Sequence, residues 1–320
     1  MENTNIEWAT HTFNPWEGCQ KVGPGCDNCY AEARNKRFGG GVAVNWGPGA
    51  PRRRTSAANW RKPLAWNANH NAFFAENGYR QRVFCSSLAD MFDNAVDPEW
   101  RDELFKLILA TPNLDWLLLT KRIGNVGNML PVPFDFDKHY PNVWIGATIV
   151  NQDEADRDIP KLLAVPAAKR FLSMEPLLGP VDLHLQREQP CTMCVSWNCE
   201  LHGMPADPPC LRRVDWVIVG GESGPGARPM HPDWPRSLRD ECHEAGVPFM
   251  FKQWGEWLPV YKPTDADDVV ACFNTWPKGR WVDADGGKTH RTWNTVMMDR
   301  VGKKAAGRLL DGREWNGVPT

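Results

Sequence analysis

Residues 143–174 read VWIGATIVNQDEADRDIPKLLAVPAAKRFLSM, and this stretch sets the expectation for the fold. The runs Val143–Thr148 and Arg170–Met174 have the length and apolar composition of buried strands, and Asp153–Leu163 between them has helical spacing. Strands that are apolar throughout and joined by a helix are typical of a parallel sheet covered on both faces. The stretch therefore predicts a strand–helix–strand unit.

The same alternation recurs on both sides of this stretch. Asp97–Ala110, which opens with an N-capping acid and a proline, and Pro232–Ala245 have helical patterns. With a first strand near Thr10–Asn14, about seven β/α units result, which suits a parallel (β/α) barrel, partial or complete, over residues 1–255. The other apolar runs of strand length are Val83–Cys85, Trp116–Thr120, Trp216–Gly220 and Pro248–Lys252.

Polar residues follow the apolar runs, where such a barrel carries its functional side chains. One polar residue after a strand is usually a helix cap or a turn, but the recurrence at every strand end predicts a site. Glu175 and Lys252 would pair with each other or with a ligand, because burying either charge alone is costly. The candidate cofactor-binding residues are Ser86, Ser87, Asp90, Thr120, Lys121, Thr148, Glu175, Gly220, Gly221, Glu222, Lys252 and Gln253.

Three thiols follow the first predicted strand in a loop rich in Gly and Pro. Cys19, Cys26 and Cys29 have the spacing C-x6-C-x2-C. A structural zinc site is normally closed by four protein ligands, whereas three thiolates on a four-iron cluster leave one iron open to a small molecule. The alternative is a zinc site that takes a fourth ligand such as His11.

Two further regions interrupt the β/α rhythm. Residues 186–213 form a Cys-rich insertion, and residues 256–320 form an extension that we expect to pack on the barrel. In the insertion, four of five residues would hold a structural zinc ion, with an auxiliary iron–sulfur cluster as the alternative. The five are Cys191, Cys194, Cys199, His202 and Cys210, and either of the last two would complete the set.

The composition narrows the class of protein. The 320 residues are 42% hydrophobic, and they contain no apolar run of membrane-spanning length and no secretory signal, so we expect a cytoplasmic protein without a membrane partner. In a reducing compartment, clustered cysteines favour metal ligation over disulfides. The net charge of −2 conceals a locally basic stretch in the first hundred residues, which either binds phosphates or is a solvated surface.

The thiol loop after the first strand resembles that of the radical S-adenosylmethionine superfamily, although its first gap is six residues instead of the usual three. The chain is similar, nearly end to end, to the phage-encoded three-Cys-motif family of radical-SAM-like proteins. The matching stretches are N-P-W-E-G-C with C-x2-C-Y-A-E, S-M-E-P-L-L-G-P from Ser173, V-I-V-G-G-E-S-G-P-G-A-R-P-M from Val217, F-K-Q-W-G-E-W from Phe251, and G-K-K-A-A-G-R-L-L-D-G-R-E-W from Gly302.

This resemblance implies a radical SAM barrel with a particular cofactor set. Cys19, Cys26 and Cys29 would ligate three irons of a four-iron–four-sulfur (4Fe-4S) cluster, and the open iron would bind S-adenosyl-L-methionine. An external electron donor would drive reductive cleavage of that cofactor to a 5′-deoxyadenosyl radical, which would act on an unknown substrate. The basic stretch and the phage affiliation favour a nucleotide or a nucleic acid as that substrate.

Two other functions remain as alternatives. The chain could be a non-enzymatic iron–sulfur or zinc protein that binds nucleic acid or a partner protein. A zinc-dependent hydrolase is disfavoured, because the chain lacks H-x-x-E-H and lacks H-x-E with C-x-x-C in the required order.

Overall fold

The computed structural model describes residues 2–185, 214–264, 280–286 and 294–319. Its centre is a 7-stranded sheet in which every neighbouring pair is parallel. The first and last strands lie at opposite ends of this order, so the sheet is a partial barrel and not a closed one. The order is β1 (His11–Phe13), β4 (Arg82–Cys85), β5 (Asp115–Thr120), β6 (Val143–Thr148), β7 (Lys169–Met174), β8 (Trp216–Gly220) and β9 (Phe249–Gln253).

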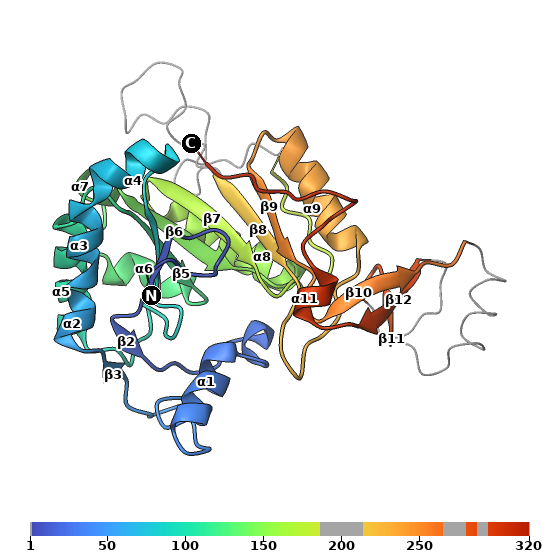
Figure 1. Cartoon of the computed structure of the whole chain (residues 1–320), viewed down its shortest axis with the longest axis horizontal. Coiled ribbons are helices and arrows are strands. Elements are labelled where there is room, and N and C mark those ends of the chain that lie inside the picture. Colours follow the sequence, from blue (N-terminus) through green and yellow to red (C-terminus); the bar gives the residue numbers. More distant parts are fainter. Residues whose placement is uncertain (1, 186–213, 265–279, 287–293, 320) are drawn as a thin grey trace.

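Helices connect the strands and cover one face of the sheet (Figure 1). The expected helices are confirmed, and α5 begins where the sequence indicates, because the Asp97 side chain accepts a hydrogen bond from the Glu99 amide and Pro98 opens the first turn. The helices are α2 (Ala57–Trp60), α3 (Lys62–Ala68), α4 (His70–Asn77), α5 (Pro98–Leu109), α6 (Ile123–Met129), α7 (Phe136–His139), α8 (Gln152–Ala164) and α9 (Asp233–Glu244).

Strand side chains alternate between two apolar layers, as the pleat requires. One layer, which includes Leu118 and Leu172, packs against the helices. The other fills the opposite, inner face and is rich in large rings. Trp8, from the segment before β1, contributes to this inner layer, with its ring centroid 4.5 Å from that of Phe84. The other buried members are Leu117, Trp144, Phe171, Trp216, Ile218 and Met250.

The chain after β9 forms a small sheet and then returns to the barrel. Strands β10 (Trp257–Tyr261), β12 (Thr295–Arg300) and β11 (Arg280–Asp283) are antiparallel, and the short helix α11 (Lys303–Ala306) follows them. The final segment then runs along β9, where the Phe251 amide donates to the Trp315 carbonyl. This segment protects the open edge of the sheet, which would otherwise present unpaired backbone groups.

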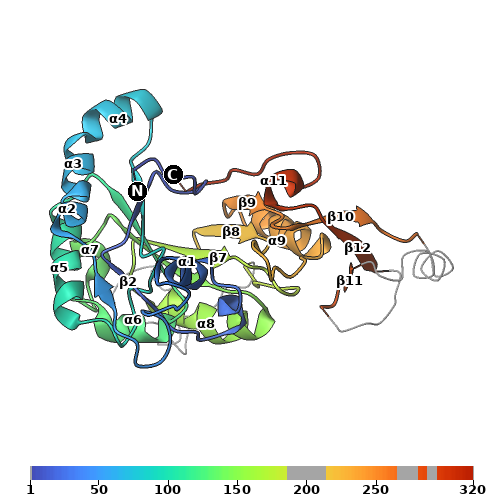
Figure 2. The ribbon, with the colours of Figure 1, turned by 60° about the horizontal axis from the view of Figure 1, so that its bottom comes forward.

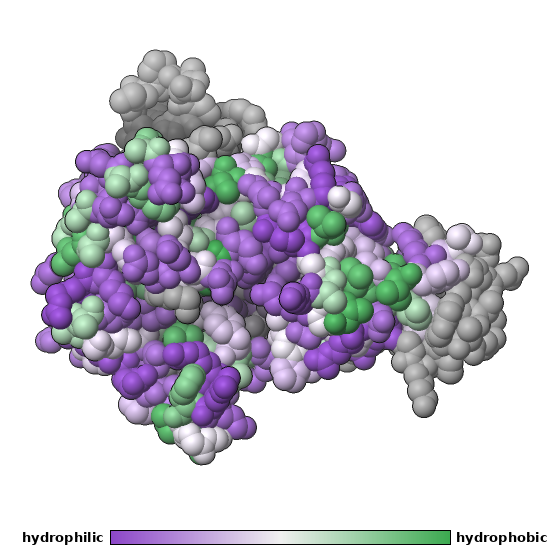
Figure 3. All heavy atoms as spheres, viewed as in Figure 1, coloured by the Kyte–Doolittle hydropathy of each residue, from purple (hydrophilic) through white to green (hydrophobic). Residues whose placement is uncertain are grey.

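The face seen in Figure 3 is mostly hydrophilic, with a hydrophobic group over the small C-terminal sheet. None of the helices in the described ranges combines the length and apolarity needed to cross a bilayer.

Candidate functional site

The thiol loop begins just after β1 and ends in a helix. Cys19 follows the short strand β2 (Trp16–Glu17), which pairs with β3 (Arg53–Arg54). Cys26 closes the 3-10 helix η1 (Pro24–Cys26), and Cys29 is the N-cap of α1 (Tyr30–Phe38). All three thiols are free, so they are not consumed by disulfides.

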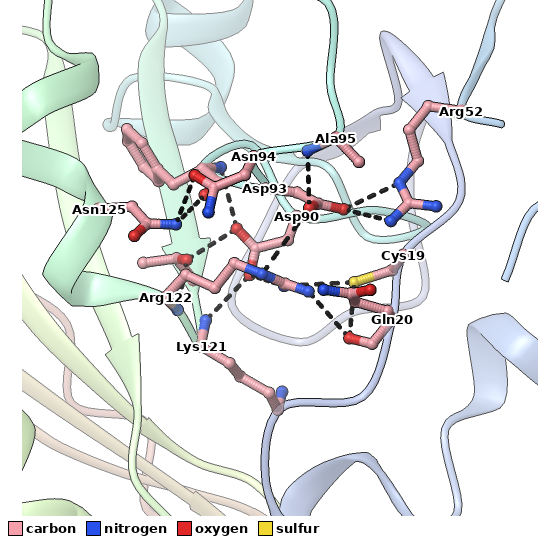
Figure 4. Close-up of polar contacts among 12 residues, drawn as sticks. Cys19, Gln20, Arg52, Asp90, Asp93, Asn94, Ala95, Lys121, Arg122 and Asn125 are labelled. Atoms are coloured by element: carbon pink, nitrogen blue, oxygen red, sulfur yellow. Dashed lines mark hydrogen bonds and ion pairs between the residues drawn. The ribbon is translucent and has the colours of Figure 1, made fainter. Parts of the chain in front are cut away.

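The start of this loop is attached to the residues that follow β5 (Figure 4). Arg122 Nη1 lies 3.4 Å from Cys19 Sγ, and its Nη2 donates to the Gln20 carbonyl at 2.9 Å. The same guanidinium pairs with Asp90 at 3.1 Å, and both side chains are only 7% exposed. Arg122 therefore joins a thiol to a buried carboxylate.

Asp90 gathers several of the predicted site residues. Its carboxylate accepts a hydrogen bond from the Thr120 hydroxyl at 2.7 Å and one from the Lys121 amide at 3.1 Å. Burial raises the pKa of Cys19 to about 11, although the positive charge of Arg122 acts in the opposite direction.

The other end of the loop is attached to the residues that follow β8. Glu222 accepts hydrogen bonds from Arg228, at 2.8 Å from its amide and 2.7 Å from Nη2, and from Asn28 Nδ2 at 3.0 Å. Arg228 in turn contacts the loop itself, through the Asp27 carboxylate at 3.1 Å and the Pro24 carbonyl at 2.9 Å. Glu222, the acid predicted to bind a cofactor, is therefore at the centre of a set of contacts that holds the thiol loop. We call Glu222, Arg228 and Asn28 the clamp.

A third contact joins the loop to the end of β4. Tyr30, one residue after Cys29, donates its hydroxyl hydrogen bond to the Ser87 carbonyl at 2.6 Å. The Ser87 hydroxyl is held by Asn14 at 3.0 Å, and Ser86 is buried with a positive φ of 66°. The loop therefore contacts the carboxyl ends of three strands, β4, β5 and β8.

The glycines after β8 serve close backbone packing. A Cβ atom on Gly221 would lie 1.9 Å from the Trp254 carbonyl oxygen, so only glycine fits there. Gly220 is less restricted, because a Cβ atom at that position would meet Glu175 at 3.4 Å. The sequence predicts Gly221 as a cofactor-binding residue; in the structure its lack of a side chain lets the backbone after β9 approach.

Polar side chains also line the interior near these strand ends. Lys252 Nζ lies 2.5 Å from Glu175 Oε2, so the pairing that the sequence left open is present. Lys121 Nζ contacts the Thr148 hydroxyl at 3.3 Å, and Gln253 Nε2 donates to Ser223 at 3.0 Å. The remaining side-chain oxygens of Glu175 and Gln253 are buried without a hydrogen-bond partner among the described residues. Such orphan acceptors are unusual and suit a ligand that donates hydrogen bonds.

Thiols are the ligands that an iron–sulfur cluster or a zinc ion takes, and these three lie at the carboxyl end of the barrel strands. Their side chains, however, are not arranged around a common centre. No group of three or more His, Cys, Asp or Glu residues in the described part of the chain is arranged to hold a metal ion. His11 is not the missing ligand, because Nε2 bonds to Gln81 at 2.7 Å and Nδ1 accepts from the Asn3 amide at 3.2 Å. The predicted ligands of the insertion, Cys191, Cys194, Cys199, His202 and Cys210, lie outside the described residues.

Some of the residues that hold the thiol loop were missing from the prediction. Asn28, Tyr30 and Arg228 act through contacts between segments far apart in the chain; Asn28 and Glu222, for example, are 194 residues apart. No local pattern indicates such contacts. The adjacency of Asn28 and Tyr30 to Cys29 was the available signal.

A comparison with protein families covers almost the whole chain. A family described as a protein of unknown function, DUF5131, matches residues 3–319. The chain belongs to this family. No curated protein and no solved structure matches the chain. The DUF5131 match takes in both the thiol loop and the C-terminal segment that returns to β9.

Proposed function

We propose that this DUF5131 protein is a radical S-adenosylmethionine enzyme. The observation that supports this most is the position of the thiol loop, which lies against the carboxyl ends of three strands of a parallel partial barrel. This is the end at which β/α barrels carry their active sites. The sequence resemblance to the radical SAM superfamily supplies the type of chemistry.

In this proposal Cys19, Cys26 and Cys29 would hold three irons of a 4Fe-4S cluster. The cluster and S-adenosylmethionine would together supply radical chemistry, the removal of a hydrogen atom from the substrate. The protein's own residues position and shield that chemistry. The Glu222–Arg228 clamp holds the loop, and Glu175 and Lys252 offer charged hydrogen-bonding groups at the barrel end.

The apolar inner layer gives the site a closed base. Trp144, Phe171 and Trp216 are buried there beneath the polar strand ends, and Trp8 covers them. Water is therefore excluded from one side of the proposed reaction site, which protects a reactive radical from side reactions. An external electron donor completes the requirements of the reaction.

The test is anaerobic purification with metal analysis, followed by a cofactor-cleavage assay. We expect iron and sulfide with visible cluster absorbance, and release of 5′-deoxyadenosine when S-adenosylmethionine and a reductant are added. Cys26→Ala should abolish both signals. Cys242→Ala is the matched control, because Cys242 is also buried and free but lies in α9, away from the loop. Zinc that survives Cys26→Ala but is lost in Cys191→Ser would assign a zinc ion to the insertion.

The same experiment distinguishes the radical enzyme from a second candidate function. In that alternative the protein is a non-enzymatic iron–sulfur or zinc protein that binds nucleic acid or a partner protein. Its support is that Glu222 is already saturated by Arg228 and Asn28 and is not available to a cofactor. A cluster without cofactor cleavage under any reductant would favour this binding function. Zinc alone on the thiol loop would exclude the radical enzyme.

A further inference from the structure

Residues 30–62 form a strongly basic segment next to the thiol loop. They contain eight Lys or Arg residues and a single acidic residue, Glu32, whereas the whole chain has a net charge of −2. The segment includes α1, which starts directly after Cys29 and lies in front of the strands in Figure 2. A concentrated positive charge of this kind attracts a polyanion.

One face of α1 combines exposed aromatic rings with cations. Tyr30, Arg34 and Phe38 are spaced by four residues, so their side chains follow one another along the helix. Phe38 is 74% exposed and Tyr30 is 60% exposed. The guanidinium of Arg34 lies 5.1 Å from the Phe38 ring centroid, and that of Arg37 lies 6.0 Å from it. The exposed part of the Phe38 ring and the two guanidinium groups beside it together offer flat surfaces on which a base can stack.

The local acids leave much of this charge unneutralised. Glu17 is shared by Arg34 and Arg53, and Arg54 pairs with Glu103. Four other cations, all exposed, make no ion pair with any of the described residues: Lys36, Arg37, Arg61 and Lys62. Phosphate groups along a chain would meet these cations without displacing a carboxylate.

The aromatic face leads from the solvent to the thiol loop. Tyr30 is bonded through its hydroxyl to the Ser87 carbonyl at the end of β4, while Phe38 lies at the far end of the same helix. In Figure 3 this segment, at the bottom of the view, is hydrophilic with a few hydrophobic side chains among the polar ones. A flexible strand along α1 would thus reach the candidate site.

We infer that α1 and the basic residues around it bind single-stranded nucleic acid, with bases stacked on Phe38 and Tyr30 and phosphates at Lys36 and Arg37. Exposed aromatic rings favour a single strand, whose bases are free to stack, over a duplex or a lipid surface. The inference rests on the proposed function only in that it takes the bound nucleic acid to be the substrate of the candidate site. Binding itself does not require the cluster.

The experiment measures fluorescence anisotropy of a labelled, mixed-sequence oligonucleotide of about 16 nucleotides at several salt concentrations. The full-length protein is used, with and without iron. We expect Phe38→Ala to weaken binding roughly tenfold, since one stacked base is lost. Lys36→Gln with Arg37→Gln should lower the slope of log K against log salt by about 1.4, because each phosphate contact on a single strand contributes about 0.7.

Matched controls lie elsewhere on the surface. Phe134→Ala removes another highly exposed phenylalanine, 90% exposed, and Lys303→Gln with Lys304→Gln removes two exposed cations from α11. Neither should change binding. Equal losses in α1 variants and controls, tighter binding of a duplex, or binding only to vesicles of phosphatidylserine would overturn the inference. If the purified protein binds the oligonucleotide but contains no iron or does not cleave the cofactor, only the proposed function is refuted.

Discussion

At the scale of single residues, the sequence position of Glu222 suggests a ligand-binding acid, whereas its contacts join it to the thiol loop. It follows Gly220 and Gly221 at the end of β8, where a ligand-binding acid was expected. Yet its carboxylate is 6% exposed and is surrounded by donors from Arg228 and Asn28. A buried carboxylate needs such partners, because leaving it unpaired would cost several kcal/mol. Through Asn28 and Arg228, the Glu222 carboxylate is linked to the thiol loop.

Replacing Glu222 with Gln should remove stability that depends on pH. Burial opposes ionisation of Glu222, but the hydrogen bonds from Arg228 and Asn28 outweigh it and hold the pKa below the ordinary 4.5. The carboxylate therefore stabilises the folded state fully above about pH 4.5, and this contribution is lost as the pH falls through the lower folded-state pKa. Glu222→Gln should lower the free energy of unfolding by roughly 2 kcal/mol at pH 7. The gap between the two proteins should narrow in acid.

Urea unfolding at a series of pH values measures this gap. Glu76→Gln is the control, because Glu76 is exposed on α4 and should give the same profile as the unmodified protein. A gap for Glu222→Gln that stays constant from neutral pH into strong acid would show that the carboxylate charge does not stabilise the loop clamp.

At the scale of elements, helix starts are encoded by a few local side chains. The Asp97 carboxylate accepts from the Glu99 amide at 2.9 Å at the start of α5, and the Asn151 side chain accepts from the Glu154 amide at 2.9 Å at the start of α8. Each cap satisfies an amide that lacks a partner within the helix. Caps such as these explain why helix positions are readable from sequence, whereas the contacts of the thiol loop are not.

Asp97→Ala should therefore destabilise the protein by about 1 kcal/mol, because the first turn of α5 loses its cap. Thermal or urea unfolding provides the measurement. Asp102→Ala changes the same residue type in the middle of α5, where it is exposed, and should shift stability by less than about 0.5 kcal/mol. If the two variants behave alike, the cap contributes nothing specific.

At the scale of the whole molecule, the two ends of the chain complete the partial barrel. Trp8 covers the inner layer, and the Trp216 Nε1 donates to the Gly317 carbonyl at 2.7 Å, next to Val318 in the same layer. The Gly317 amide also bonds to the Phe249 carbonyl. An open sheet has a free edge and an uncovered face, and the terminal segments protect both.

Ending the chain at Gly307 should leave β9 with an exposed edge and uncover Trp216. We expect the shortened protein to aggregate or to unfold at much lower denaturant concentration, as followed by size-exclusion chromatography and urea unfolding. Trp216→Phe is the milder counterpart: it keeps a buried ring, removes the hydrogen bond to Gly317 and should cost about 1 kcal/mol. A shortened chain that unfolds at the original midpoint would show that the returning segment is dispensable.

Part of the fold and part of the candidate site could be predicted from the sequence alone. The apolar runs predicted six of the seven strands of the large sheet, and Asp97 predicted the start of α5, because period and capping act between residues close in the chain. The polar strand ends also predicted that Asp90, Thr120 and Lys121 lie at one edge, and the structure brings them together.

Only the tertiary structure decided the rest. Whether the barrel closes, whether Glu175 meets Lys252, and whether Glu222 faces a ligand or Arg228 all depend on the path of the chain between distant segments. Lys252 and Glu175 are 77 residues apart, and Asp90, which follows β4, finds its partners Thr120 and Lys121 at the end of β5. Such contacts form because buried charges require partners, and the choice among available partners is made by packing.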